Sequence, residues 1–463
     1  MKEYFTQINA REQRNILLGL LFFLLALQIF FLQIHEGKYT LIFLFIPPLL
    51  CFGIGLYRPV WGVSLGMGIL PLLTNEISVG AGRSISSTKI TIVVLILLWF
   101  IKAEKKLEGQ REILAAWLAY FVVSIISLIA SGSSLTKLLA IGEGGAVFLV
   151  FLSTLSFIKN DHSRELSLVV IGAGGAVAIV LWFLQVGLLE WAGVYMPLAY
   201  RSGIEEGPSF FRGSFLAHQN LFGAYCILLG GIYFSLSTKA NKNWKIILVI
   251  AGILSWVLLL KLGSVGSMVG VIVSIYVGIL ICGNKSKIIA STAAILLVLA
   301  FFGVKSLVSG NPDSKNGIEG SFTIRTYALK YGFKAWRDNP LLGSGPGSFE
   351  AEILRAENKS KERKPDFRFK GSLSAHNEYF RNLVERGVIG FVVFSLLISV
   401  YLWKVYTVYN PINTSMPWMF LGLLAFTVSA FLEDIYSQSG LYSIFWGLGG
   451  MYLGVVNAKD GSF

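Results

Sequence analysis

Charged residues are scarce in this chain of 463 residues. Lys, Arg, Asp and Glu together make up 14% of it, whereas hydrophobic residues make up 54%. About a quarter of the residues in an ordinary soluble domain are charged, so this composition excludes a typical soluble protein. The mean hydropathy of +0.67 indicates a polytopic membrane protein.

Cysteine and histidine are also scarce, with three and four residues respectively. Cys51, Cys226 and Cys282 all fall within apolar stretches, where cysteine behaves as a small buried apolar residue. Neither a disulfide framework nor a metal-ligand spacing is visible. The sequence therefore predicts no metal site and no cofactor.

Long apolar stretches, in contrast, recur along the whole chain. About 20 apolar residues cross a bilayer as a helix. The candidate spans are residues 15–33, 39–57, 59–73, 88–101, 113–130, 136–157, 165–189, 214–236, 245–260, 263–282, 288–308, 387–407, 416–432 and 439–456. Three of them are short, so we predict an all-α fold, a polytopic bundle of 12–14 transmembrane helices. No cleavage site follows the first stretch, which predicts a retained helix and not a signal peptide.

Basic residues outnumber acidic ones and give a formal charge of +13, but they are spread over many short connections. Such a distribution does not favour nucleic-acid binding. With the amino terminus inside, the inner connections hold more Lys and Arg than the outer ones, which is the positive-inside pattern. We therefore predict transmembrane helices in residues 1–308, one large outer loop at 309–386 and C-terminal transmembrane helices in 387–463.

Glycines recur within two predicted spans, as IGEGGAV at 141–147 and IGAGGAV at 171–177. Small residues let helices approach closely in a membrane, so both segments predict close packing. Glu143 lies in the first of them. An intramembrane carboxylate indicates either a functional site or a pair with a neighbouring helix, and the sequence leaves both open.

Two other regions hold basic side chains on the predicted outer side. Arg212 and His218 lie among aromatic residues in the loop from 191 to 220, where they indicate either an anion site or an interfacial aromatic belt. Lys261 lies in the turn LLLKLGSVGSMVG at 258–270. This turn interrupts an apolar run, and its freed backbone groups predict a cavity wall or packing against protein.

The large polar loop begins with a predicted amphipathic helix at 321–337. Its apolar positions recur at helical spacing, and they are Ile324, Tyr327, Ala328, Tyr331 and Ala335. Arg325 lies on the basic face, which is turned either to solvent or to phosphates. The glycines Gly343, Gly345 and Gly347 predict a turn, or less strongly a phosphate cradle. The charged residues 350–370 predict a flexible, exposed lid.

The loop ends in SLSAHNEYFRNLVERG at 372–387, which predicts a helix that begins near its serines and ends at Gly387. His376 and Tyr379 share a face of this helix by their spacing. A neutral imidazole is suited to general-base catalysis. The structural alternative is a histidine bonded to a neighbouring loop.

Three segments together resemble the O-antigen ligase and O-antigen polymerase superfamily. They are FRGSFLAHQN at 211–220, RTYALKYGFKAWRDNPLLGSGPGSF at 325–349 and SAHNEYFRNLVERGVIG at 374–390. The third, with Ala-His-Asn-x-Tyr, is the most specific. The resemblance implies a GT-C-like fold and a metal-independent, inverting glycosyltransferase of the bacterial cytoplasmic membrane, with its active site on the periplasmic side.

The same resemblance implies the residues of the site. Arg212 and Arg325 are expected to bind the pyrophosphate of an undecaprenyl-linked glycan donor, and His376 is expected to be the catalytic base. Four further residues are expected to support the site: Lys261, His218, Asn377 and Tyr379. Val265 stands where the family often has an arginine, for which Lys261 is a substitute. The implied acceptor is lipid A-core for a ligase, or another lipid-linked glycan for a polymerase.

A transporter or flippase of an anion or lipid-linked sugar is the alternative from another class. Glu143 and the turn at Lys261 favour it, because transporters place charge and broken helices near the bilayer midplane. No inverted repeat is visible, however, and the polar residues concentrate in outer loops. We therefore favour the transferase, with membrane lipids and lipid-linked glycans as partners and no nucleic acid.

Overall fold

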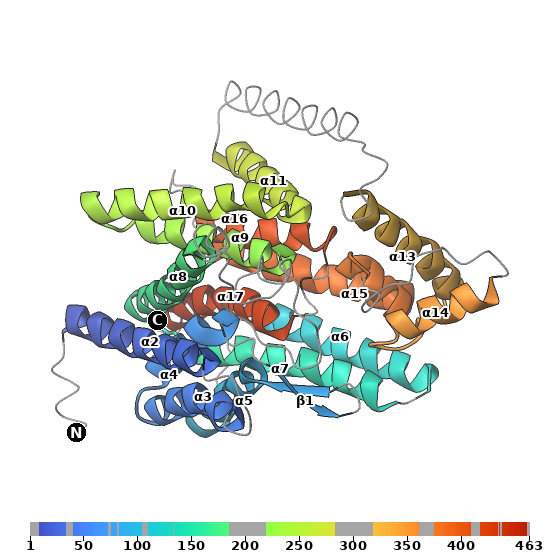
Figure 1. Cartoon of the computed structure of the whole chain (residues 1–463), viewed down its shortest axis with the longest axis horizontal. Helices are drawn as coiled ribbons and strands as arrows, with labels where there is room; N and C mark the ends of the chain where they lie inside the picture. Colours follow the sequence, from blue (N-terminus) through green and yellow to red (C-terminus); the bar gives the residue numbers. More distant parts are fainter. Residues whose placement is uncertain are drawn as a thin grey trace.

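The computed structural model describes residues 9–33, 40–72, 76–80, 83–103, 110–132, 134–184, 219–282, 318–360, 375–408, 417–433, 435 and 438–460. In these ranges the chain forms helices, which pack side by side as a bundle, and one small hairpin (Figure 1). The predicted all-α fold of a polytopic membrane protein is confirmed.

The first half of the bundle consists of α2 Ala10–Gln33, α3 Thr40–Tyr57, α4 Pro59–Ile69, the 3-10 turn η1 Leu70–Leu72, α5 Ser87–Lys102, α6 Arg111–Ala130, α7 Leu135–Phe157 and α8 Asp161–Phe183. The second half consists of α9 Gln219–Ser237, α10 Lys242–Leu262, α11 Val265–Cys282, α13 Ile318–Asp338, α14 Phe349–Lys359, α15 Glu378–Val408, α16 Trp418–Ser429 and α17 Ser439–Asp460. Helices satisfy every backbone group within one segment, which a lipid environment requires.

Short polar residues begin several of these helices. The side chains of Ser86, Ser134, Asn160 and Asn241 each accept a backbone N–H three residues later, at the start of α5, α7, α8 and α10. Such caps satisfy N–H groups that have no partner within the helix. Polar caps thus mark where these four helices begin.

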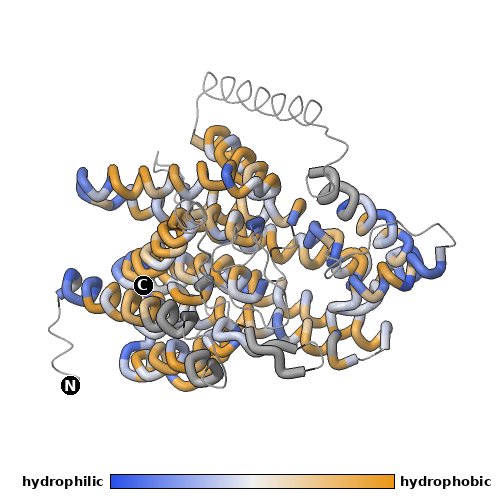
Figure 2. The backbone as a smooth tube through the Cα atoms, viewed as in Figure 1, coloured by the Kyte–Doolittle hydropathy of each residue, from blue (hydrophilic) through white to orange (hydrophobic). Residues whose placement is uncertain are grey.

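Eight of the described helices are long and apolar enough to cross a membrane. Three shorter apolar helices, at 45–57, 59–69 and 418–429, accompany them. The expected span at 288–308 lies outside the described residues, so the total of 12–14 stays a prediction. Polar residues gather in α13 and α14 and at the opposite, left-hand ends of α2 and α10 (Figure 2).

The centre of the bundle is formed by α9 and α17. In the most apolar 18-residue stretch of each helix, 78% and 89% of the residues are buried. α9 packs on α10 and α16, and α17 packs on α7. Close approach requires glycine at the contact of α9 with α16, where a Cβ on Gly231 would lie 3.1 Å from the Cα of Gly422. α6 and α10, in contrast, leave Leu and Ile side chains exposed on their outer faces, as lipid-facing helices do.

The two glycine segments behave differently. In IGAGGAV, a Cβ on Gly175 would lie 2.1 Å from Leu229, and one on Gly172 would lie 3.1 Å from Tyr233, so close packing on α9 is confirmed. In IGEGGAV, nothing lies within 4 Å of a Cβ built on Gly142. The prediction of close packing is wrong there, because this part of α7 faces outward.

A β-hairpin between η1 and α5 was not predicted. Strand β1 Glu76–Gly80 pairs antiparallel with β2 Arg83–Ser86, with Ile77 opposite Ile85. Apolar and small or polar residues alternate on both sides of a short turn, which is the pattern of a hairpin. The pattern is too short to stand out between two apolar spans.

An outer layer of α13 and α14 covers the start of α15 (Figure 1). The helix predicted at 321–337 is confirmed as α13, and its predicted core positions Tyr327, Ala328, Tyr331 and Ala335 are buried. The lid predicted at 350–370 is wrong over its first half, which forms α14. Phe349, Ile353 and Ala356 recur at helical spacing there and pack into the same small core. Residues 361–374 lie outside the described residues.

α15 begins before the predicted end of the outer loop, and it consists of two helices that meet at Gly387, whose φ of 68° and ψ of −170° are not helical. The predicted end of the first helix at this glycine is therefore confirmed. A turn at 340–345 supplies backbone partners on both sides of the kink. Pro340 O accepts from Val388 N at 2.9 Å, and Gly345 N donates to Glu385 O at 2.8 Å. The kink therefore costs little in lost hydrogen bonds.

The glycine turn packs against protein and does not form the alternative phosphate cradle. A Cβ on Gly343 (φ 68°) would lie 2.4 Å from the backbone of Glu385, and one on Gly345 (φ 98°) would lie 2.3 Å from Ser131 Oγ. The N–H groups of both glycines donate to backbone carbonyls. Because those donors are used and the space is filled, the phosphate-cradle interpretation is wrong at these two residues.

Candidate active site

Three residues from distant parts of the chain meet around the carboxylate of Glu433, and together with it we call them the Glu433 cluster. Arg325 donates from Nη2 to Glu433 Oε1 at 2.7 Å. Asn220 donates from Nδ2 to Oε2 at 2.8 Å, and Nδ1 of His376 lies 3.7 Å from the same oxygen. Two predicted site residues, Arg325 and His376, are thus brought together on a carboxylate that is 4% exposed.

Glu433 is held by the connection between α16 and α17. This connection docks on the start of α15, since Ala430 O accepts the N–H of Glu378 at 2.9 Å. The ring of Phe431 stacks on Tyr379 with 3.8 Å between ring centroids and 9° between planes. These two contacts fix the segment that carries Glu433 against the segment that carries His376.

His376 precedes α15 and does not lie on it. Its φ of +47° is unusual for a residue other than glycine. Asn377 Oδ1 accepts the N–H of Phe380 at 2.9 Å and so caps the helix. The predicted shared helical face of His376 and Tyr379 is therefore wrong, and the predicted serine caps are replaced by Asn377. In this conformation Nδ1 of the imidazole faces Oε2 of Glu433.

Arg325 reaches the cluster from the basic face of α13. Its side chain is 24% exposed, and its Nε is buried without a hydrogen-bond partner in the described part of the chain. Glu433 therefore occupies only part of a guanidinium that has five N–H donors. The exposed part of the guanidinium can take an anion.

Gly266 lies directly beneath Glu433. A Cβ on this glycine would lie 2.8 Å from Glu433 Cγ. Gly266 is in the first turn of α11, just after Gly263 (φ +65°) ends α10. The turn predicted to line a cavity or pack on protein thus packs on protein, below the cluster. Val265 is 48% exposed at this point.

The other predicted site residues lie elsewhere. Arg212 and His218 lie outside the described residues. Lys261 is exposed at the end of α10, and no contact that the structure describes joins it to Glu433. Tyr379 packs on Phe431 and Phe394, so its ring serves packing.

Glu143 is exposed on α7. Among the described contacts, none connects it with the Glu433 cluster or pairs it with a neighbouring helix. Within the same described ranges, no three His, Cys, Asp or Glu side chains gather as a metal site. A metal-independent reaction stays a prediction.

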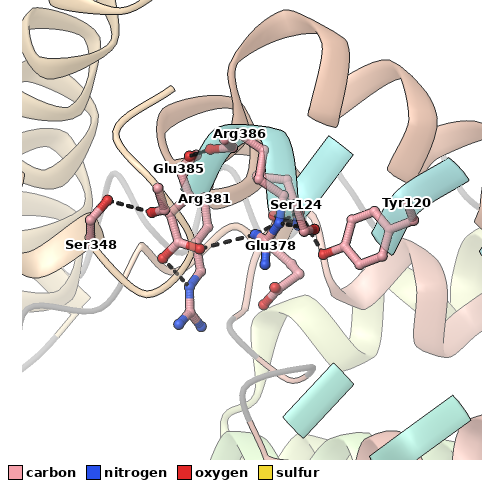
Figure 3. Close-up of polar contacts among 10 residues, drawn as sticks. Tyr120, Ser124, Ser348, Glu378, Arg381, Glu385 and Arg386 are labelled. Carbon is pink, nitrogen blue, oxygen red and sulfur yellow. Dashed lines mark hydrogen bonds and ion pairs between the residues drawn. The ribbon is translucent and has the colours of Figure 1, made fainter. Parts of the chain in front are cut away.

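A second buried polar group, the Arg386 network, fixes the first part of α15 against α6 (Figure 3). Arg386 donates to Ser124 Oγ at 3.0 Å, to Asn382 Oδ1 at 3.1 Å and to Glu385 Oε2 at 3.0 Å, and it lies over the ring of Tyr120. Tyr120 in turn donates to Asn382 Oδ1 at 3.0 Å. This network holds the helix that follows His376.

Sequence reasoning missed Glu433 and Asn220. Glu433 lies between the predicted spans 416–432 and 439–456, and the predicted topology puts that connection on the same outer side as His376. A carboxylate in a short outer connection was the available signal. Asn220 ends the first family-like segment, in AHQN, and offered no separate signal.

Comparison with known families decides what this site belongs to. Residues 250–395 match the family described as O-Antigen ligase. The chain contains a domain of the O-antigen ligase/polymerase superfamily. The suspected resemblance to the O-antigen ligase and polymerase superfamily is confirmed over this segment, in a chain whose helices are those of a multi-pass membrane protein. A search of curated proteins gave no match.

The O-antigen ligase match covers the segment from the middle of α10 to the middle of α15. It therefore contains Arg325 and His376, together with the outer layer of α13 and α14. Asn220 and Glu433 lie outside it. The cluster is thus assembled from the O-antigen ligase domain and from helices on either side of it.

Proposed function

We propose that this protein is an inverting glycosyltransferase that moves a glycan from undecaprenyl pyrophosphate to an acceptor hydroxyl at the outer face of the bacterial cytoplasmic membrane. The observation that carries this proposal is the meeting of Arg325 and His376 on Glu433. An anion-binding guanidinium and a base are the two groups that such a transfer needs. Both come from the O-antigen ligase domain.

Arg325 would bind the pyrophosphate of the donor. A departing pyrophosphate carries roughly two to three negative charges, which arginine binds through paired N–H groups. The partial exposure of the Arg325 side chain, of which 24% is accessible, supports this role. Arg212 would be the second binding residue, by the family resemblance. Positive charge placed before the reaction stabilises the leaving group as its bond breaks.

His376 would activate the acceptor. Its neutral imidazole takes the hydroxyl proton while the hydroxyl oxygen forms a bond to the anomeric carbon. The bond from that carbon to the pyrophosphate oxygen breaks, and undecaprenyl pyrophosphate leaves with the electron pair. Attack on the face opposite to the leaving group inverts the anomeric centre. The leaving group is already stable, so no acid is required.

A ligase that uses lipid A-core is the reaction we favour, and a polymerase of O-antigen, capsular or exopolysaccharide repeats is the alternative within the superfamily. Both share Arg325 and His376, so the acceptor distinguishes them. The test uses purified protein in liposomes with an undecaprenyl-linked oligosaccharide and lipid A-core. Labelled lipid A-core would identify a ligase, and lengthened lipid-linked chains would identify a polymerase.

The transporter alternative depended on Glu143 and Lys261, and neither is joined to the cluster by a contact in the described residues. The same liposomes test it. Movement of lipid-linked sugar across the bilayer without any covalent product would contradict the proposed transfer. Arg325→Ala should lose at least about tenfold in transfer, or about 1.4 kcal/mol. Arg337→Ala, an exposed arginine on the same helix, is the matched control and should keep the wild-type rate.

A further inference from the structure

Glu433 is a buried carboxylate whose two oxygens are both in use. Burying a carboxylate is costly unless it is paired and hydrogen-bonded. Arg325 bonds one oxygen, whereas Asn220 bonds the other and His376 faces it. Three partners from three parts of the chain thus converge on a group that is 4% exposed. This arrangement differs from a surface ion pair, which water would weaken.

The orientation of the imidazole is fixed by the backbone. His376 adopts φ +47°, and the start of α15 is bonded and stacked onto Ala430 and Phe431. These two residues precede Glu433 closely in the chain. The imidazole and the carboxylate are therefore held by two segments that are locked to each other, and Nδ1 is the ring nitrogen that faces Glu433.

We propose that Glu433 is a positioning residue, which keeps the hydrogen of His376 on Nδ1, so that Nε2 is the nitrogen that takes the proton of the acceptor hydroxyl. The partner of one ring nitrogen decides which nitrogen carries the hydrogen. The 3.7 Å between Nδ1 and Oε2 exceeds an N–H···O hydrogen bond by about half an ångström. A shift of that size closes it when the imidazole gains charge. The proposal rests on the proposed role of His376 as the base.

The same carboxylate holds Arg325. Among the described contacts Oε1 accepts from Nη2, so Glu433 anchors the guanidinium at one corner, while the Arg325 side chain stays 24% exposed. Glu433 therefore sets the spacing between the group that binds the donor and the group that activates the acceptor. Substitution of Glu433 is therefore expected to change both kcat and the donor KM, although Glu433 itself does not contact substrate.

The first test reads the tautomer directly. The chain has four histidines, so isotope-labelled histidine gives few nitrogen NMR signals, and the signal lost in His376→Ala assigns His376. We expect the hydrogen on Nδ1 in the wild type and on Nε2 in Glu433→Leu, which offers no acceptor. Glu433→Gln turns one of the two acceptor oxygens into an NH2 group, so that Arg325, Asn220 and Nδ1 compete for the oxygen that remains, and part of the hydrogen should move to Nε2. Hydrogen on Nε2 in the wild type would overturn the proposal.

The second test measures transfer by full-length protein in liposomes. Glu433→Gln should lower kcat at least about tenfold, because general-base assistance supplies about 10²- to 10⁴-fold. It should also raise the donor KM. The matched control is Glu112→Gln, which breaks an exposed pair with Lys404 of 2.9 Å and should leave both constants unchanged. A wild-type kcat in Glu433→Gln would refute the positioning role.

These outcomes separate the inference from the proposed function. If His376→Ala abolishes transfer while Glu433→Gln does not, the base stands and the role of Glu433 is wrong. If His376→Ala transfers at the wild-type rate, the proposed base itself is wrong. If Glu433→Leu fails to fold, the Glu433→Gln variant and the tautomer of His376 in the wild type still test the proposal.

Discussion

The Arg386 network allows one stability effect to be worked out from the structure. Arg386→Met would leave Glu385 buried with one remaining cation, since the two side chains are 8% and 2% exposed. Breaking a buried ion pair costs about 3–5 kcal/mol. Arg381, which donates to Glu385 at 3.1 Å and is 26% exposed, keeps part of the pairing. We therefore expect Arg386→Met to lower the free energy of unfolding by about 3 kcal/mol.

Unfolding of the purified protein by SDS in mixed micelles measures this loss. Arg386→Met combined with Glu385→Gln should recover most of it, because a buried pair replaced by uncharged groups costs little. Lys359→Met, which breaks an exposed pair with Asp338 of 2.7 Å, is the control and should cost about 0–1 kcal/mol. A loss below about 1 kcal/mol for Arg386→Met, or a double variant as unstable as the sum of the single ones, would refute the reasoning.

Three further predictions concern the site and its support. Gly266→Ala places a methyl group 2.8 Å from Glu433 Cγ and should lower the transfer rate. The variant should still purify as a folded, monodisperse protein. An unchanged transfer rate would show that Glu433 can move freely. Gly343→Ala should cost about 2 kcal/mol or more in the same SDS titration, because φ is 68° and the backbone of Glu385 lies 2.4 Å from the new Cβ; wild-type stability would contradict the packing of this turn. Arg325→Lys keeps the charge but loses the paired N–H groups, so the donor KM should rise about tenfold or more at an unchanged acceptor KM; steady-state kinetics with both substrates checks this, and an unchanged donor KM would argue against pyrophosphate binding by Arg325.

Local periodicity was enough to predict much of the fold. α13 follows from apolar residues at helical spacing. α14 was missed because its charge density hid the apolar stripe of Phe349, Ile353 and Ala356. Hydropathy reports average polarity, whereas a short helix on a protein surface needs only three or four buried positions. The break within α15 was predicted, because a glycine with positive φ is typical of a helix end, and Gly387 adopts φ 68°.

The candidate site was predicted in part. Arg325 and His376 were named from family-like segments, but their meeting point was not. Arg325 and Glu433 are 108 residues apart, and Asn220 and Glu433 are 213 apart. Contacts over such separations depend on how helices pack, which one sequence does not reveal. The positive φ of His376 likewise arises from the docking of α15 on the α16–α17 connection, and no local sequence pattern predicts it.

The most direct test of the central claim is the rate of glycan transfer by His376→Ala in liposomes that contain an undecaprenyl-linked donor and an acceptor. His162→Ala, which changes an exposed histidine in the first turn of α8, is the matched control. We predict that His376→Ala loses about 10²- to 10⁴-fold in kcat, while His162→Ala keeps the wild-type value. Equal rates for the wild type and His376→Ala would contradict the assignment of the base.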